Sequence, residues 1–395
     1  MANRLLFQWG VSSLFGWGIY GLNLALHGWR NGVEVASACP IAPQQLALDP
    51  ARQWALSPFF FLSNQLTKHL LQPGPALVKG SVALHSLGNN LGYAAMGANN
   101  ACVMGDRTYG VAFFEDSRID AAAMIKGRDY HRIIVGSHWN GEVLRRYGLE
   151  NVEVVLQGVD DTLFHPAPRA NLFHENFTIF SGGKLEFRKG QDLVLRIFRA
   201  FRQRHPEALL VTAWHSPWAA NLAQSMGRLE GIAPVPVAQG GKIDVSGWAQ
   251  ANGIPQGAVL DLGAVPNAMM PQLLREMDCA LFPNRCEGGT NLVAMEAMAC
   301  GLPVVLSANS GQRDLIDGEN CYPLTRQAAV LSAPGGWGAD GWGECDVEEG
   351  VEALEAIYQN RQEAKRRGAL AAQTLSRLTW SSQIKELLTV LQLVS

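Results

Sequence analysis

Short apolar runs alternate with amphipathic segments along the chain, in two consecutive series. Such alternation is typical of parallel sheets whose faces are covered by helices. The first series predicts strands at residues 5–9, 33–36, 82–85, 109–114 and 133–136, and helices at 19–30 and 140–147. The second predicts strands at residues 177–180, 208–213, 259–261, 279–282 and 304–306, and helices at 192–204 and 292–300. We therefore expect an α/β protein with two Rossmann-like sheets.

A boundary between the two series is expected at residues 166–171, which have the composition of a linker. A chain of 395 residues has room for two or three domains, and its 48% of hydrophobic residues can supply their cores. We expect an N-terminal Rossmann-like domain at residues 1–168 and a C-terminal one from residue 169 to residue 376.

The overall charge and the cysteines narrow the class of protein. A net charge of −3 argues against a nucleic-acid-binding protein, whose binding surface would be strongly basic. Seven scattered cysteines without a CxxC motif favour reduced thiols and a cytoplasmic location, and they offer no zinc-ligand spacing. No run approaches 18 apolar residues, so we expect no transmembrane segment, while peripheral membrane contact stays open.

The segment Leu292–Cys300 is the most informative single element. It is apolar on nearly every side, which predicts a buried helix, yet it carries one carboxylate, Glu296. A buried carboxylate is costly without a partner. The hydroxyl pair of a ribose would be a suitable partner, and an arginine elsewhere in the core is the alternative.

The start of this helix is a candidate anion site. Gly288 and Gly289 precede it, and Thr290 is the expected N-cap. Free backbone N–H groups and the positive end of a helix favour phosphate at such a place. The segment therefore predicts a seat for a nucleoside diphosphate, with its phosphates at the helix start and its ribose at Glu296.

Two further glycine-bounded loops carry candidate donor contacts. Lys184 and Lys189 lie five residues apart between a predicted strand and a predicted helix, where two cations would stabilise a diphosphate. The alternative is two exposed lysines on a turn. Gly16, Gly18 and Gly21 match GxGxxG, with Glu34 further on, but the first glycine lies several residues beyond its strand. That distance suits a mobile glycine loop before a helix better than a tight pyrophosphate turn.

Residues 287–303 resemble the paired-glutamate signature of retaining glycosyltransferase family 4, whose members are GT-B enzymes that use nucleotide sugars. The resemblance covers most of the chain. It includes Gly16 and Gly18 at the N-terminal glycine loop, residues 136–140 and 157–160 at the end of the first domain, Lys184 and Lys189 at the basic pair, Leu262, Gly263 and Asp278 in the second domain, and residues 378–380 before the last helix.

The resemblance implies both an architecture and a set of roles. Residues 1–168 would face the acceptor, residues 169–376 would bind the nucleotide sugar, and a helix in residues 377–395 would pack back on the N-terminal domain. Lys184 and Lys189 would neutralise the diphosphate, Glu287 would meet the donor sugar, and Glu296 would hold the ribose. The expected donor site is completed by Gly16, Gly18, Gly183, Gly288, Gly289, Thr290, Asn291 and Leu292.

The chain departs from the family pattern at three places. Eight residues separate Glu287 from Glu296 where the family has seven, so either a bulge restores Glu287 or other groups hold the sugar. Lys184 stands where Arg is commoner, which keeps the charge and loses the bidentate geometry. Glu115 stands roughly where the first domain of the family has an active-site His. We take Glu115, His85 and His138 as acceptor-side candidates, each of which has a structural alternative.

The implied reaction moves a hexose-type sugar to a hydroxyl of a glycan, lipid or small molecule with retention of configuration. The leaving phosphate can take the proton, so positioning and charge stabilisation are the main work of the protein. No DxD triplet is present, so we expect no metal, and no cofactor besides the nucleotide sugar as co-substrate. Loops at residues 57–80 and 88–108 are expected to contact the acceptor, and the glycine-rich residues 334–343 to form a surface loop.

Three other functions stay open at this point. The chain could bind nucleotide sugars without turnover, as the spacing of its glutamates suggests. It could be a GT-B epimerase that acts on nucleotide sugars. An NAD(P)-dependent oxidoreductase would rest on the GxGxxG match and Glu34 alone.

Overall fold

The computed structural model describes residues 3–216, 225–226, 229–237, 242–331 and 333–394. Its first half is built on a six-stranded parallel sheet in the order β2-β1-β4-β6-β7-β8. The strands are β1 (Arg4–Gln8), β2 (Glu34–Ser37), β4 (Val82–Leu87), β6 (Arg107–Ala112), β7 (Ile133–Val135) and β8 (Val152–Val154). The helices are α1 (Gly16–Arg30), α2 (Pro50–Ala55), α3 (Ser57–His69), α4 (Ala121–Asp129) and α5 (His138–Arg146).

Residues 57–69, expected to belong to an acceptor loop, form helix α3 instead. A proline in its first turn suits a helix start, and Phe59 and Ser63 face the protein interior. The chain then forms β3 (Gly74–Leu77), which pairs with β5 (Ala101–Met104) in a separate two-stranded parallel sheet. The prolines at 73 and 75 and the glycine between them favour a loop, so the local pattern does not indicate the strand.

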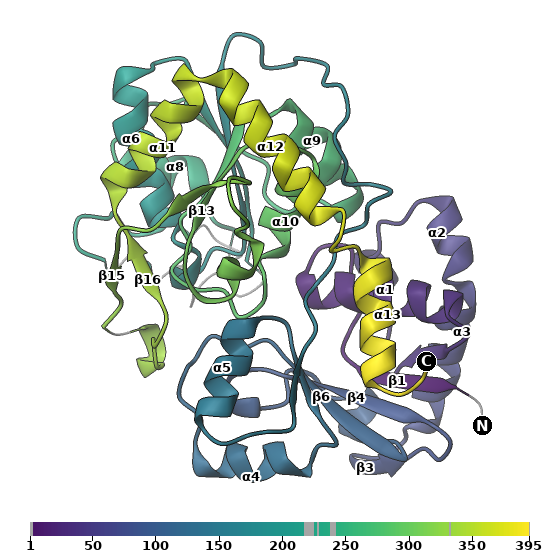
Figure 1. The fold of residues 1–395 in the computed structure, drawn as a ribbon. Helices are drawn as coiled ribbons and strands as arrows, with labels where there is room; N and C mark the ends of the chain where they lie inside the picture. The colour runs from purple at the N-terminus through teal and green to yellow at the C-terminus, as the bar shows by residue number, and fades with distance from the viewer. Residues whose placement is uncertain (1–2, 217–224, 227–228, 238–241, 332, 395) are drawn as a thin grey trace.

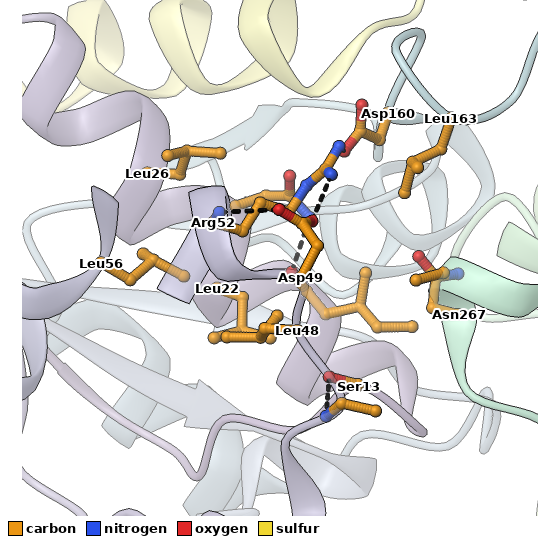
Figure 2. Close-up of a pocket in the computed structure, with 14 residues that line it drawn as sticks. Ser13, Leu22, Leu26, Leu48, Asp49, Arg52, Leu56, Asp160, Leu163 and Asn267 are labelled. Atoms are coloured by element: carbon orange, nitrogen blue, oxygen red, sulfur yellow. Dashed lines mark hydrogen bonds and ion pairs between the residues drawn. The ribbon is translucent and has the colours of Figure 1, made fainter. Parts of the chain in front are cut away.

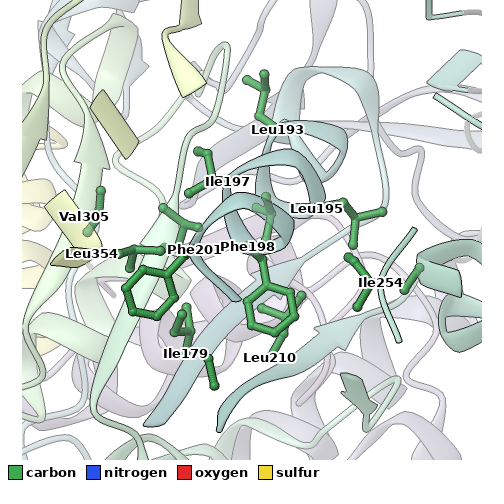
Figure 3. Close-up of a cluster of buried hydrophobic side chains, with 14 of the residues drawn as sticks. Ile179, Leu193, Leu195, Ile197, Phe198, Phe201, Leu210, Ile254, Val305 and Leu354 are labelled. Atoms are coloured by element: carbon green, nitrogen blue, oxygen red, sulfur yellow. The ribbon is translucent and has the colours of Figure 1, made fainter. Parts of the chain in front are cut away.

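The second half contains another six-stranded parallel sheet, in the order β11-β10-β9-β12-β13-β14. Its strands are β9 (Phe177–Gly183), β10 (Ala208–Trp214), β11 (Val259–Asp261), β12 (Cys279–Phe282), β13 (Val304–Ser307) and β14 (Tyr322–Leu324). Helices that accompany it are α6 (Gln191–Arg204), α8 (Val245–Ala251), α9 (Met270–Glu276), α10 (Leu292–Ala299), α11 (Val347–Gln359) and α12 (Arg361–Leu375). Figure 3 shows Ile197, Phe198 and Phe201 of α6 packed in the same cluster as Ile179 and Leu210 of the sheet.

The last helix, α13 (Trp380–Val390), returns to the first half of the chain and lies beside α1 (Figure 1). Trp380, Ile384 and Leu387 are buried there in one cluster with Tyr20 and Leu24 of α1. This crossing confirms the expected architecture of two Rossmann-like sheets with a returning C-terminal helix. The predicted boundaries after residues 168 and 376 lie between β8 and β9 and between α12 and α13.

All seven thiols are free, and six of them are buried, while Cys102 is half-buried. No helix in the described part of the chain has both the length and the apolar character needed to cross a bilayer.

Candidate functional site

The two sheets face each other through the loops that follow their strands. Ser137, which follows β7, donates a hydrogen bond of 2.7 Å from its hydroxyl to the carbonyl of Gly288. A side chain at Gly288 would lie 2.5 Å from the carbonyl oxygen of Phe114, so glycine permits this close approach. A side chain at Gly289 would likewise lie 2.6 Å from Oε1 of Gln157. These contacts place the glycines before α10 directly against the first domain.

His138, an acceptor-side candidate, lies at this interface as the first residue of α5. Its backbone N–H donates to Asp314 Oδ2 at 2.8 Å, and its ring Nδ1 lies 3.2 Å from Asp314 Oδ1. The side chain stays 63% exposed. The structure therefore uses His138 to join the two domains, and its contact with an acceptor stays a prediction.

Helix α10 begins at Leu292 as expected, but its N-cap lies one residue later than the predicted Thr290. Asn291, with φ of 67°, is the N-cap, and its side chain accepts from the N–H of Ala294. The prediction of Thr290 as the cap was wrong: its hydroxyl is buried against the sulfur of Met295. Asn tolerates the left-handed conformation that this junction needs, whereas the β-branched Thr does not. The extra residue between the two glutamates is thus accommodated beside a left-handed turn.

The first turn of α1 faces the first turn of α10 across the interface. A side chain at Gly16 would lie 3.4 Å from Cδ1 of Leu292, which is the first residue of α10. The two helix N-termini therefore lie close together, and both favour negative charge. The prediction of a mobile loop at Gly16 and Gly18 was wrong, since both belong to α1. Gly18 is needed there because a side chain would lie 2.3 Å from the backbone N of Ser12.

Glu296 is buried inside α10, with 6% of its surface exposed. Its carboxylate accepts a hydrogen bond of 2.5 Å from Nδ2 of Asn267. In the described part of the chain no arginine or lysine pairs with it, so the arginine alternative is excluded for these residues. Burial raises the pKa of Glu296 to about 8, although the Asn267 amide opposes the shift.

Asn267 connects Glu296 to a pocket of about 50 Å³ between the two domains. Figure 2 shows the amide at one side of this pocket, opposite Leu22 and Leu26 of α1. The backbone N–H of Asn267 also donates to the carbonyl of Ser13 at 2.9 Å. Arg52 on the same pocket wall binds Asp160 at 2.7 Å. Sequence reasoning missed Asn267 because no motif surrounds it.

Lys189 and Glu287 are bound to each other instead of facing open space. Lys189 Nζ lies 2.5 Å from Glu287 Oε1, which also accepts from Nδ2 of Asn284 at 2.5 Å. Arg188 Nη1 donates to the other oxygen of Glu287 at 2.9 Å. Burial alone would raise the pKa of Glu287, but Lys189 and Arg188 hold it below its usual value. The Lys189 side chain passes over Gly183, close enough that a Cβ there would be 3.7 Å from it.

Arg188 is the centre of this charge network, and sequence analysis did not single it out. It lies 2.7 Å from Glu186, 2.9 Å from Glu287 and 3.3 Å from Glu115, which belongs to the first domain. Burial opposes its charge, but these three carboxylates hold its pKa well above the ordinary value. Lys184 pairs with Glu186 at 3.1 Å. Three cations and three carboxylates thus balance in one cluster, which we call the interdomain charge network.

The glycine-rich residues 334–343, expected to form a surface loop, contact the first domain at Glu115 and Asp116. The segment leads into β16 (Gly343–Cys345), which pairs with β15 (Gln327–Ala329). The indole of Trp342 donates to the carbonyl of Glu115 at 3.0 Å and is buried. The N–H of Gly338 donates to Asp116 at 2.7 Å. The segment therefore bridges the domains, because its glycines let the backbone reach the first domain closely.

The position of His85 does not fit its expected role as an acceptor-side residue. Its side chain is buried in the first sheet, where Nδ1 lies 2.9 Å from the hydroxyl of Tyr130 and Nε2 lies 2.8 Å from the carbonyl of Val103. Both ring nitrogens are occupied, and burial lowers the pKa of the ring. The predicted position at a strand end was wrong, because β4 continues to Leu87.

Whole-chain structural similarity decides the fold. Sucrose-phosphate synthase from Thermosynechococcus elongatus superimposes with a TM-score of 0.62 at 15% identity, covering 98% of each chain. Anabaena HepE, solved in complex with UDP and glucose, superimposes with a TM-score of 0.63 at 13% identity, covering 99% of this chain and 100% of that one. The chain has the GT-B fold.

The sequence comparisons each match only part of the chain. Residues 176–334 match the family described as "Glycosyl transferases group 1". The D-inositol 3-phosphate glycosyltransferase of Salinispora arenicola is 29% identical over 188 residues, and that of Salinispora tropica is 28% identical over 199 residues. These matches span 43% and 45% of this chain, and only 38% and 37% of those relatives.

Proposed function

We propose that this GT-B protein is a retaining glycosyltransferase of family 4 that moves a hexose-type sugar from a nucleoside-diphosphate sugar to an acceptor hydroxyl without a metal. The match of residues 176–334 to group 1 glycosyl transferases supports the reaction class. Solved relatives of the same fold that hold UDP or UDP-glucose support the class of donor. Retention and metal independence rest on the family resemblance and on the absence of a DxD triplet.

One observation carries the proposal. Glu296 is a buried carboxylate with a single amide partner, on the helix whose N-terminus faces that of α1. Leaving such a group so poorly compensated costs stability in the free protein. A ribose that donates its hydroxyls to Glu296 would remove that cost. Its diphosphate would then lie near Leu292 and Gly16, at the two helix N-termini.

In the proposed mechanism the protein positions the donor and stabilises the leaving diphosphate. Lys184, Arg188 and Lys189 lie near the end of β9, on the loop before α6. The diphosphate takes the place of carboxylates as the partner of Lys189 and Arg188, because charge-assisted bonds to phosphate are strong. Charge that develops on the leaving phosphate is then stabilised by fixed cations and helix N-termini. That phosphate can accept the proton of the arriving hydroxyl.

The charge network also favours a second candidate, a protein that binds nucleotide sugars without turnover. Glu287, proposed to meet the donor sugar, already accepts from Lys189, Arg188 and Asn284. If these bonds persist with donor bound, Glu287 does not touch the sugar and Lys189 does not touch the phosphate. The donor would then bind through Glu296 and the helix N-termini alone.

A panel of nucleotide sugars separates these candidates. The donor that binds the native state raises the melting temperature, and its base and sugar identify the substrate class. With that donor, the transferase proposal predicts sugar release to water or to an acceptor, and the anomeric configuration of the product tests retention. Activity that persists in a chelator supports metal independence. Tight binding with no turnover towards glycan, lipid and small-molecule acceptors would favour a protein that binds nucleotide sugars without catalysis. Conversion of the donor sugar into its epimer would indicate an epimerase.

A further inference from the structure

Large apolar side chains protrude from α2, from α3, from the segment after α3 and from β3. Trp54 is 79% exposed, Phe61 63%, Leu71 74% and Leu77 62%. Figure 1 places α2 and α3 at the outer edge of the first domain. On α3 the exposed Phe61 and Lys68 are seven residues apart, so they lie on one stripe of the helix.

The same region lacks negative charge. No aspartate or glutamate occurs between Asp49 and Asp106, although the chain contains 35 acidic residues. Of the two that flank the region, Asp49 is paired with Arg52, and Asp106 accepts from the backbone N–H of Gly80. Lys68 and Lys79 are exposed and form no ion pair with any described residue. Residues 1–105 carry five Lys and Arg against two Asp and Glu, in a chain of net charge −3.

We propose that the α2–α3 face, formed by Trp54, Phe61, Lys68 and Leu71, docks on an anionic lipid surface. Single aromatic and leucine side chains can enter the headgroup region of a bilayer with their apolar ends. Lysines beside them can stay at the level of the lipid phosphates and bind them. A protein partner of ordinary composition would instead need a complementary cavity for each protruding side chain. The absence of acidic side chains removes the repulsion that most of the molecule would meet at such a surface.

The position of this face next to the interdomain pocket bears on how an acceptor is reached, a consequence that rests on the proposed function. Helix α2, which carries Trp54, also carries Arg52 into the wall of the interdomain pocket, and Leu56 at its C-terminal end lines the same pocket. Docking through this helix brings the interdomain pocket near the headgroup layer. An acceptor held in that layer would reach the cleft without leaving the membrane.

Sedimentation with lipid vesicles tests the proposal on the full chain. One set of vesicles is phosphatidylcholine alone, and the other contains about one third phosphatidylglycerol. We expect binding to the anionic vesicles only, and its loss at high salt because screening weakens the lysine contacts. Trp54→Ala with Phe61→Ala should reduce binding about tenfold or more, and Lys68→Glu with Lys79→Glu should do the same.

A matched control removes two equally exposed leucines elsewhere. Leu172→Ala with Leu331→Ala changes side chains that are 70% and 95% exposed outside this region, and should leave vesicle binding unchanged. All variants should keep the melting temperature of the parent, since the altered side chains are exposed. Three results would overturn the proposal: no binding of the parent protein to anionic vesicles, equal loss in the control variant, or a dimer in solution that Trp54→Ala with Phe61→Ala dissociates.

Discussion

Glu287 and Glu296 are both buried, yet they have very different surroundings. Glu287 accepts from two cations and an amide, which hold its pKa below the usual value. Glu296 accepts from one amide, and burial raises its pKa to about 8. A carboxylate with a low pKa is already satisfied in the free protein, whereas one with a raised pKa still lacks donors. This difference makes Glu296 the better candidate for a ligand contact.

Replacing Glu296 by Gln should stabilise the free protein at alkaline pH. The folded pKa of about 8 lies above the unfolded value, so the folded state binds the proton more tightly. The parent therefore loses stability as pH rises from the unfolded pKa towards 8, and Glu296→Gln does not. Urea unfolding at pH 5 and pH 8 should show the variant gaining on the parent by about 1 kcal/mol or more. Equal changes in the two proteins would contradict the raised pKa.

Lys189→Ala should lower the turnover of the proposed transferase by about 10²-fold or more, because a fixed cation at the leaving phosphate is lost. Rates with saturating donor measure this effect directly. Lys365→Ala, on the exposed side of α12, serves as the control and should keep full activity. A Lys189 variant with the activity of the parent would remove this residue from the donor site.

At the scale of the elements, local patterns predicted most of the strands and the helices around the donor site. Apolar runs and helical periodicity are short-range features, so β9, α6 and α10 were expected close to their observed limits. Helix starts were less predictable. Gly16 begins α1 although glycine is a poor helix former, because the approach of Ser12 to Gly18 fixes the first turn. Such an approach between segments leaves no local signal.

Gly18→Ala tests this contact. Alanine favours a helix over glycine, but its Cβ would lie 2.3 Å from the backbone N of Ser12, which must move. We expect a loss of about 2 kcal/mol in the free energy of unfolding and weaker donor binding. Gly10→Ala is the matched control, since a Cβ at Gly10 would meet no atom within 4 Å, and it should change stability by less than about 0.5 kcal/mol. Equal stability of both variants would contradict the proposed role of Gly18.

At the scale of the whole molecule, contacts between segments that are distant in the sequence hold the two domains together. Arg188 joins Glu115 and Glu287, and Trp342 reaches the carbonyl of Glu115. Arg188 is adjacent to Lys189 in the sequence, but its partners Glu115 and Glu287 come from other loops, so the network could not be predicted from local pattern. The same holds for Asn267, whose partner Glu296 lies on a different element. The two Rossmann-like sheets were predictable, because the alternation of strands and helices runs through the entire chain, and the GT-B arrangement was implied by the family resemblance.

Trp342→Ala should loosen the closed arrangement of the two domains. The change removes a buried indole and its bond to the carbonyl of Glu115, at a cost of about 3 kcal/mol in stability. Small-angle scattering should show a larger radius of gyration for the variant than for the parent. Leu331→Ala, next to the same segment but 95% exposed, should leave it unchanged. An unchanged radius in Trp342→Ala would show that the bridge does not hold the domains together.

The central claim is that Glu296 receives the ribose hydroxyls of the donor. Isothermal titration can compare the best-binding nucleoside diphosphate with its 2′,3′-dideoxy form, on the parent protein and on Glu296→Gln. We predict that the missing hydroxyls weaken binding to the parent about tenfold or more, and to the variant by no more than about twofold. The same tenfold loss in both proteins, or none in the parent, would contradict the assignment.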